Sequence, residues 1–144
     1  MSMTFATAPS TVAPGLSVTR LNLMRGGYLL MAVGLALVKW PLLHQAHTQP
    51  FYEGVTLCLL TAMSLLAFLG LRYPVKLLPV LLFESTWKIL WLSLVALPKA
   101  LDGSIDAATS ENVVNCSLIV LIIAVIPWGY VWRTYVRATG DRWR

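Results

Sequence analysis

The sequence predicts an all-α, integral membrane four-helix bundle with both termini in the cytoplasm. Three observations lead to this fold. Only 12% of the 144 residues are charged and 58% are hydrophobic, whereas soluble domains carry about 25% charged residues. Four apolar stretches are each close to the ~20 residues that a membrane-spanning helix needs. Most of the basic residues lie at the same set of helix ends, as expected for the cytoplasmic side.

The four stretches are residues 23–43, 54–71, 76–98 and 113–132. They use most of the chain, so we expect one four-helix domain over residues 20–137. Residues 1–19 have no charge and are rich in Ser, Thr, Ala and Pro, which predicts a flexible cytoplasmic tail without the apolar core of a signal peptide. Residues 138–144 are expected to form a basic cytoplasmic tail.

Small residues and prolines shape the predicted helices. The first helix contains Gly27 and Gly34, which allow a neighbouring helix to approach closely. In the third helix, Pro79 removes one backbone hydrogen bond, so we expect a bend just before Glu84. The fourth stretch, 113–132, contains the apolar run 118–126, which ends at Pro127-Trp128-Gly129-Tyr130.

The positions of the charges predict the topology. Eight of the 11 basic residues fall on one side of the predicted spans: Arg20, Arg25, Arg72, Lys76, Arg133, Arg137, Arg142 and Arg144. By the positive-inside rule, both termini and the turn at residues 72–76 are cytoplasmic. The loops at residues 44–52 and 99–111 are then outside.

Charged and aromatic residues inside the third stretch form the main candidate site. Glu84, Trp87, Lys88 and Trp91 follow i, i+3, i+4, i+7 spacing, so a helix places them on one face. An ionisable residue in a span costs roughly 2.5–3.5 kcal/mol unless it is paired, which predicts that this face points toward other helices.

Two interpretations of this face stay open. Glu84 and Lys88 could form an intrahelical ion pair that neutralises both charges during insertion, or they could bind a substrate or carry a proton. We favour the ion pair. Lys39 and Asn115 are further candidates for the intramembrane polar site. Lys39 is expected to extend to the outer surface unless it meets Glu53.

Cys58 and Cys116 form a possible thiol pair. Each follows a glutamate by five residues, Glu53 and Glu111 respectively, so both thiols could lie at a similar shallow depth below the outer surface. A disulfide facing an oxidising compartment is one interpretation. We favour two small, apolar, reduced thiols in helix cores.

The sequence does not indicate a metal or cofactor. His44 and His47 are three residues apart, and Glu53 could supply a third ligand, but we expect two solvated histidines. There is no Cys-x-x-Cys motif, phosphate-binding glycine loop, nucleophile elbow or zinc-hydrolase motif. The basic residues follow the topology, so no nucleic acid partner is predicted.

The first half of the chain resembles the DoxX-like family of small four-helix membrane proteins. The resemblance lies in Gly34 five residues before Lys39, and in Glu53-Gly54 opening a helix that closes with Leu-Gly-Leu-Arg at 69–72. It implies association with membrane-bound redox or sulfur-oxidation systems, often as an accessory subunit. The charged third helix departs from the family's pattern. Residues 72–91 and 140–144 are similar to an uncharacterised group of bacterial membrane proteins.

Three functions follow as hypotheses. The first is an accessory or interaction subunit in a bacterial inner membrane, without catalysis of its own, whose partners are the lipid bilayer and another protein or a second copy. The second is a redox subunit that acts on a quinone or thiol through Cys58, Cys116 and Lys39. The third is a small-solute or proton-coupled transporter using Glu84 and Lys88.

Overall fold

The computed structural model describes residues 15–141, and every regular element in that range is helical. Residues 1–14 and 142–144, which include most of the predicted N-terminal tail and the end of the basic C-terminal tail, lie outside the described range. The elements in chain order are α1 (Val18–Lys39), the 3-10 helix η1 (Trp40–Thr48), α2 (Phe51–Arg72), α3 (Leu78–Trp91), the π-helix η2 (Leu92–Ala96), α4 (Leu97–Leu101), α5 (Ala107–Ser117), α6 (Ile119–Val125), α7 (Trp128–Val131) and the π-helix η3 (Trp132–Val136).

Four helical segments of the described chain are long and apolar enough to cross a membrane. They are Val18–Thr48, Phe51–Arg72, Leu78–Leu101 and Ala107–Val125. At 1.5 Å per residue, a helix of 22 residues such as α2 is about 33 Å long, close to the ~30 Å hydrocarbon core of a bilayer. The prediction of an all-helical fold with four such helices is confirmed, and it indicates a multi-pass membrane protein.

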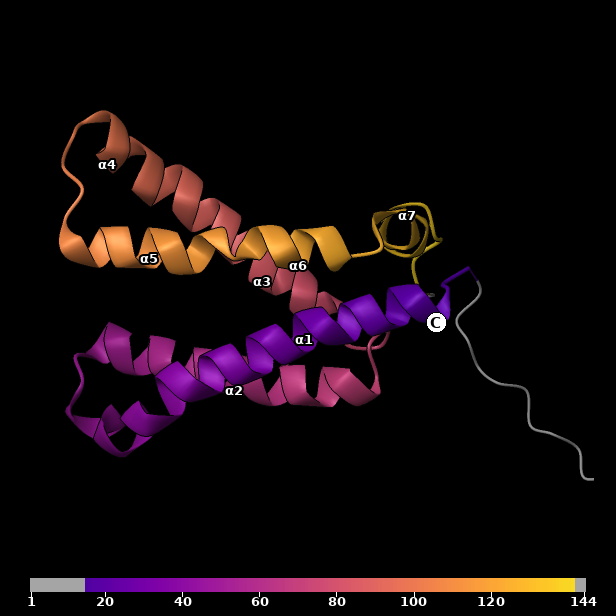
Figure 1. Cartoon of the computed structure of the whole chain (residues 1–144), viewed down its shortest axis with the longest axis horizontal. Coiled ribbons are helices and arrows are strands. Elements are labelled where there is room, and N and C mark those ends of the chain that lie inside the picture. Colours follow the sequence, from indigo (N-terminus) through magenta and orange to yellow (C-terminus); the bar gives the residue numbers. More distant parts are fainter. Residues whose placement is uncertain (1–14, 142–144) are drawn as a thin grey trace, which may run out of the picture.

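The four spans form two pairs that diverge (Figure 1). The first pair is α1 with α2, and the second is the α3–α4 segment with the α5–α6 segment. The pairs pack together toward the end where the described chain begins and finishes, and they separate toward the other end, which carries η1 and the connection from α4 to α5.

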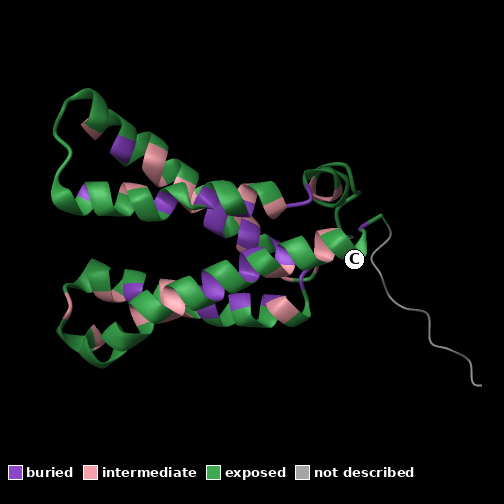
Figure 2. Cartoon of the chain, viewed as in Figure 1, coloured by how far each residue is buried: buried purple, intermediate pink, exposed green. Residues whose placement is uncertain are grey.

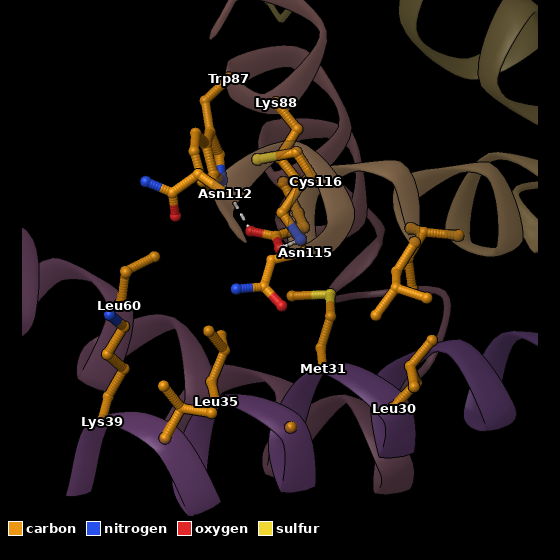
Figure 3. Close-up of a pocket in the computed structure, with 15 residues that line it drawn as sticks. Leu30, Met31, Leu35, Lys39, Leu60, Trp87, Lys88, Asn112, Asn115 and Cys116 are labelled. Atoms are coloured by element: carbon orange, nitrogen blue, oxygen red, sulfur yellow. Dashed lines mark hydrogen bonds and ion pairs between the residues drawn. The ribbon is translucent and has the colours of Figure 1, made fainter. Parts of the chain in front are cut away.

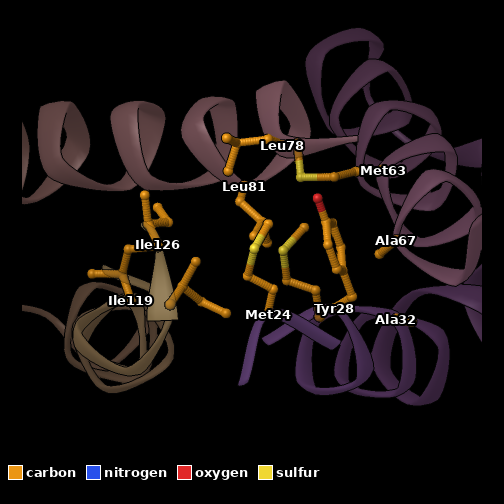
Figure 4. Packing of buried hydrophobic residues seen from close by; sticks show 11 residues of the cluster. Met24, Tyr28, Ala32, Met63, Ala67, Leu78, Leu81, Ile119 and Ile126 are labelled. Atoms are coloured by element: carbon orange, nitrogen blue, oxygen red, sulfur yellow. The ribbon is translucent and has the colours of Figure 1, made fainter. Parts of the chain in front are cut away.

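The core lies where the pairs meet, and the remaining helix surface is largely exposed and apolar (Figure 2). Side chains of all four spans contribute to it (Figure 4). Its buried members are Met24, Tyr28, Met31, Ala32, Met63, Ala67, Leu78, Leu81, Ile119, Ile122 and Ile126. Exposed apolar surface on this scale is what lipid covers in a membrane protein.

Three side chains of α1 fasten the packed end by donating to the backbone of other elements. Arg20 Nη2 lies 2.6 Å from the carbonyl oxygen of Ile126, and Arg25 Nε lies 3.1 Å from that of Leu71. The Tyr28 hydroxyl donates to the Pro74 carbonyl at 2.8 Å. The last carbonyls of a helix have no partner within the helix, so α1 stabilises the ends of two other spans.

The predicted bend at Pro79 is wrong. The chain at 74–77 forms turns and α3 begins only at Leu78, so Pro79 lies in the first turn, where its missing N–H is not needed. The irregularity of this span is instead the π-helix η2, in which the Leu97 N–H donates to Leu92 O. Pro98 follows directly, and it has no N–H to continue a regular ladder of backbone bonds.

The predicted bounds of the first and fourth spans also need correction. The first begins at Val18, where Ser17 caps α1 by accepting from Arg20 N. The fourth begins at Ala107 and ends at Val125 rather than running over 113–132. Ile126 is extended, because a residue before proline is driven out of the helical region by Pro127.

Candidate functional site

A cleft of about 290 Å³ lies between the two pairs of spans (Figure 3). It extends along α1 from Leu30 to Lys39, a distance of about 13.5 Å at 1.5 Å per residue, and so reaches the end where the pairs diverge. Its lining consists of Leu30, Met31, Gly34, Leu35, Val38, Lys39, Leu60, Glu84, Trp87, Lys88, Asn112, Asn115, Cys116, Leu118 and Ile122.

An ion pair with an indole donor lies in the wall of the cleft. Lys88 Nζ is 2.7 Å from Glu84 Oε1, and Trp87 Nε1 donates to Glu84 Oε2 at 2.7 Å. Both carboxylate oxygens therefore have partners, and Glu84 is only 1% exposed. The Lys88 ammonium lies 5.6 Å from the centre of the Trp87 ring, within the range of a cation–π contact. The i, i+4 pairing favoured from the sequence is present, and its face points to other helices.

Several donors of the cleft remain unused by the described residues. Lys88 has three N–H groups and makes one bond, to Glu84. Asn112, Asn115 and Lys39 form no side-chain hydrogen bond or ion pair within residues 15–141. Asn112 and Asn115 belong to a helix apolar enough to cross a membrane, where an unsatisfied amide is costly.

The cleft combines these donors with an apolar floor. Leu30, Met31 and Leu35 of α1 lie opposite Asn115 (Figure 3). The charged groups of the lining are Lys39, Lys88 and Glu84, which leaves a formal charge of +1. A group that binds here should therefore be apolar for most of its length and present a hydrogen-bond acceptor or a negative charge.

The structure brings together most of the residues singled out in the sequence. Glu84, Trp87, Lys88, Lys39 and Asn115 all line the cleft, whereas the half-buried Trp91 does not. Sequence reasoning did not assign Asn112 to the site. The available signal was its spacing of three from Asn115, which places the two amides on one face of a helix.

The two cysteines do not meet in the cleft. Both are free thiols; Cys116 is buried and lines the cleft, whereas Cys58 is exposed on α2 and does not. Lys39 does not pair with Glu53 either. These two side chains line a separate hollow of about 360 Å³ near η1, and no ion pair joins them.

Within the described residues, no cluster of His, Cys, Asp and Glu could hold a metal ion. His44 and His47 lie on η1, away from the cleft lining, and a nitrogen of the His44 ring is 2.9 Å from Gln45 Nε2. The groups that face the cleft can bind and orient a molecule through hydrogen bonds, charge and apolar contact.

At the diverging end, the loop before α5 is fixed by Asp106. Its carboxylate accepts from Thr109 N at 2.6 Å, which caps α5, and from Lys99 Nζ at 3.1 Å. Lys99 Nζ also lies 2.9 Å from Thr109 Oγ1. Hydrogen bonding from Thr109, followed by the contact with Lys99, lowers the pKa of the Asp106 carboxyl from 3.8 to about 2.

No protein-family model matches the chain, and no curated protein or solved structure is detectably similar to it. The resemblance of the first half to the DoxX-like family therefore stays a prediction.

Proposed function

We propose that this protein is a small, non-catalytic interaction subunit of a bacterial inner-membrane complex, with both termini in the cytoplasm, and that a partner protein binds in the cleft. One observation carries the proposal: Asn112 and Asn115 line the cleft from within an apolar span, and neither amide has a partner among the described residues. Both asparagines are exposed, and an amide that faces hydrocarbon without a hydrogen bond costs several kcal/mol. A partner that supplies acceptors would remove this cost.

The size of the cleft defines how the partner binds. An α-helix with its side chains is about 10 Å wide, so a cleft of about 290 Å³ accepts a few side chains of a partner helix rather than the helix itself. The formal charge of +1 favours an acidic or amide side chain among apolar ones. We infer that the partner helix lies along the opening between the two pairs and inserts one polar residue toward Lys88 and Asn115.

A photo-crosslinking amino acid at two neighbouring positions tests this function. Leu60 lines the cleft, whereas Leu59 on the same helix is 59% exposed on the surface assigned to lipid. The probe at position 60 should yield a protein adduct in intact cells, and the probe at position 59 should yield lipid adducts only.

Two further variants test whether the captured protein uses the polar groups of the cleft. Asn112→Leu and Asn115→Leu should each reduce the protein adduct at position 60, while the amount of protein in the membrane serves as the control. Protein adducts of equal yield at positions 59 and 60, or only lipid and small-molecule adducts at both, would contradict the proposed role.

The second candidate is a small-solute or proton-coupled transporter. It is favoured by a carboxylate, Glu84, that faces a cleft closed at one end by the core around Tyr28 and Leu81. The sequence contains no internal repeat of the kind that transporters use for alternating access. Uptake of protons into liposomes that is lost in Glu84→Gln would favour this candidate over the first.

The redox alternative, which the DoxX-like resemblance suggests, would have to use Cys116 as its single thiol in the cleft. Purification with a bound quinone would support it.

A further inference from the structure

A second set of unbalanced charges lies far from the cleft, at the end of the molecule where the pairs pack together. There, the beginning of α1 meets the chain that follows the fourth span (Figure 1). The two meet around a hollow of about 370 Å³, which is lined by Gly15, Leu16, Ser17, Arg20, Pro127, Trp128, Gly129, Tyr130 and Arg133.

Two guanidinium groups share this hollow. Arg20 uses Nη2 to bind the Ile126 carbonyl at 2.6 Å, and Arg133 uses Nε to bind the Gly129 carbonyl at 3.2 Å. A guanidinium has five N–H groups, so each arginine keeps donors beyond these bonds. The ion pairs of the described residues involve Lys88 and Lys99, and neither arginine has a carboxylate partner there. Two like charges around one hollow create a site for an anion.

The segment that carries Arg133 lies across the spans. In Figure 1, α7 is seen end-on, whereas the spans run roughly horizontally across the picture, and η3 continues α7 directly. Trp128, Trp132, Tyr135 and Val136 are all exposed along α7 and η3, and we call these four side chains the aromatic face of this segment. A short helix with an aromatic face that runs parallel to the membrane plane suits the headgroup region of a bilayer.

We propose that this hollow binds the phosphate of an anionic phospholipid, whose chains then lie along the aromatic face of α7 and η3. Guanidinium groups bind phosphate in a bidentate geometry, and Trp128 and Tyr130 are residue types that favour the interface. The same end of the spans carries Arg25, Arg72 and Lys76, which raise the local concentration of anionic lipid. The proposal goes beyond the partner cleft, because it concerns other residues at the opposite end.

Native mass spectrometry of the full chain, released from membranes that contain phosphatidylglycerol and phosphatidylcholine, tests the site. The wild type should retain one phosphatidylglycerol in preference to phosphatidylcholine. Arg133→Lys keeps the charge and removes the bidentate geometry, so the retained fraction should fall about fivefold, the equivalent of ~1 kcal/mol. Arg137→Lys makes the same change on η3's C-terminal side, outside the hollow lining, and should leave retention unchanged.

A second arm separates a lipid from free phosphate. Inorganic phosphate added up to millimolar concentration should not displace the retained lipid, because it lacks the chains that contact the aromatic face. Displacement by inorganic phosphate would overturn the lipid assignment. Equal losses in Arg133→Lys and Arg137→Lys, or no loss in either, would overturn the site itself. The melting temperature of each variant in detergent checks that the chain remains folded.

Discussion

The Lys88 ammonium and the Glu84 carboxylate lie 2.7 Å apart on successive turns of α3, with side-chain exposures of 15% and 1%. The Glu84 side chain is thus almost completely buried, whereas the Lys88 side chain reaches the cleft. Because Trp87 donates to the second carboxylate oxygen, Glu84 is held by two neighbours of its own helix. This arrangement lets the charge be neutralised as soon as the helix forms.

Breaking the pair should therefore destabilise the protein more than removing it whole. We expect Lys88→Met to cost about 3–5 kcal/mol, because it leaves Glu84 buried without a counter-charge, and Glu84→Gln to cost less, because Lys88 reaches the cleft. The double variant should recover much of this loss. Thermal unfolding in detergent measures the cycle, and Thr86→Val, at an exposed position of the same helix, is the control. Strictly additive losses would mean that the two charges do not stabilise each other.

Gly70 allows α2 to approach the Tyr28 ring. A Cβ atom at position 70 would collide with this ring, whereas one at Gly26 would meet nothing within 4 Å. Gly70→Ala should therefore lower stability by about 1–3 kcal/mol, and Gly26→Ala should be neutral or slightly stabilising. Tyr28→Leu should partly rescue Gly70→Ala. Equal melting temperatures for the two alanine variants would contradict the close packing of α1 and α2.

The topology can be checked with reporter fusions after Gln49, Tyr73, Asp106 and Arg144. The distribution of basic residues predicts cytoplasmic activity at Tyr73 and Arg144, and periplasmic activity at Gln49 and Asp106. The opposite pattern at Tyr73 or Arg144 would exclude the proposed orientation. It would also move the paired arginines of the hollow to the outer face.

The stabilisation that Asp106 gives to the loop at the diverging end should depend on pH. Its folded-state pKa of about 2 lies below the ordinary 3.8, so the carboxylate stabilises the fold fully above pH 3.8, and this contribution is lost as the pH falls through about 2. Carbon-13 NMR of the Asp106 carboxyl in micelles should show a titration midpoint near 2. In Lys99→Met the midpoint should rise but stay below 3.8, because the bonds from Thr109 remain. A wild-type midpoint at 3.8 would show that the cap does not form.

The sequence predicts the parts of this structure that depend on neighbours along the chain. The i, i+4 spacing of Glu84 and Lys88 is enough to predict their pairing, because a helix fixes the distance between them. The predicted end of the fourth span at residue 132 is wrong. The apolar residues around Trp128 extend the apolar stretch past Pro127, whereas Pro127 drives Ile126 out of the helix, which ends at Val125. The predicted bend at Pro79 is wrong, because a proline bends a helix only when a turn of helix precedes it, and α3 begins at Leu78.

The cleft could not be predicted, because it depends on how two helix pairs are oriented. Met31 and Asn115 are far apart in sequence, and no periodicity in either helix specifies which face meets which. Tyr28 illustrates the same limit: its hydroxyl reaches the Pro74 carbonyl only once α1 has packed against the turn after α2. Such contacts are decided by tertiary packing rather than by local pattern.

Arg20, Arg25 and Tyr28 hold the two helix pairs together at one end, so the opposite ends of the pairs are the ones that can move apart. The pairs meet at the core around Tyr28, and their free ends are η1 and the α4–α5 connection. The end of α1 at Lys39 lies 11 residues beyond Tyr28, about 16.5 Å along the helix, so a rotation of about 5° displaces it by roughly 1.4 Å. We therefore expect the separation of these ends, and with it the volume of the cleft, to change with bilayer thickness.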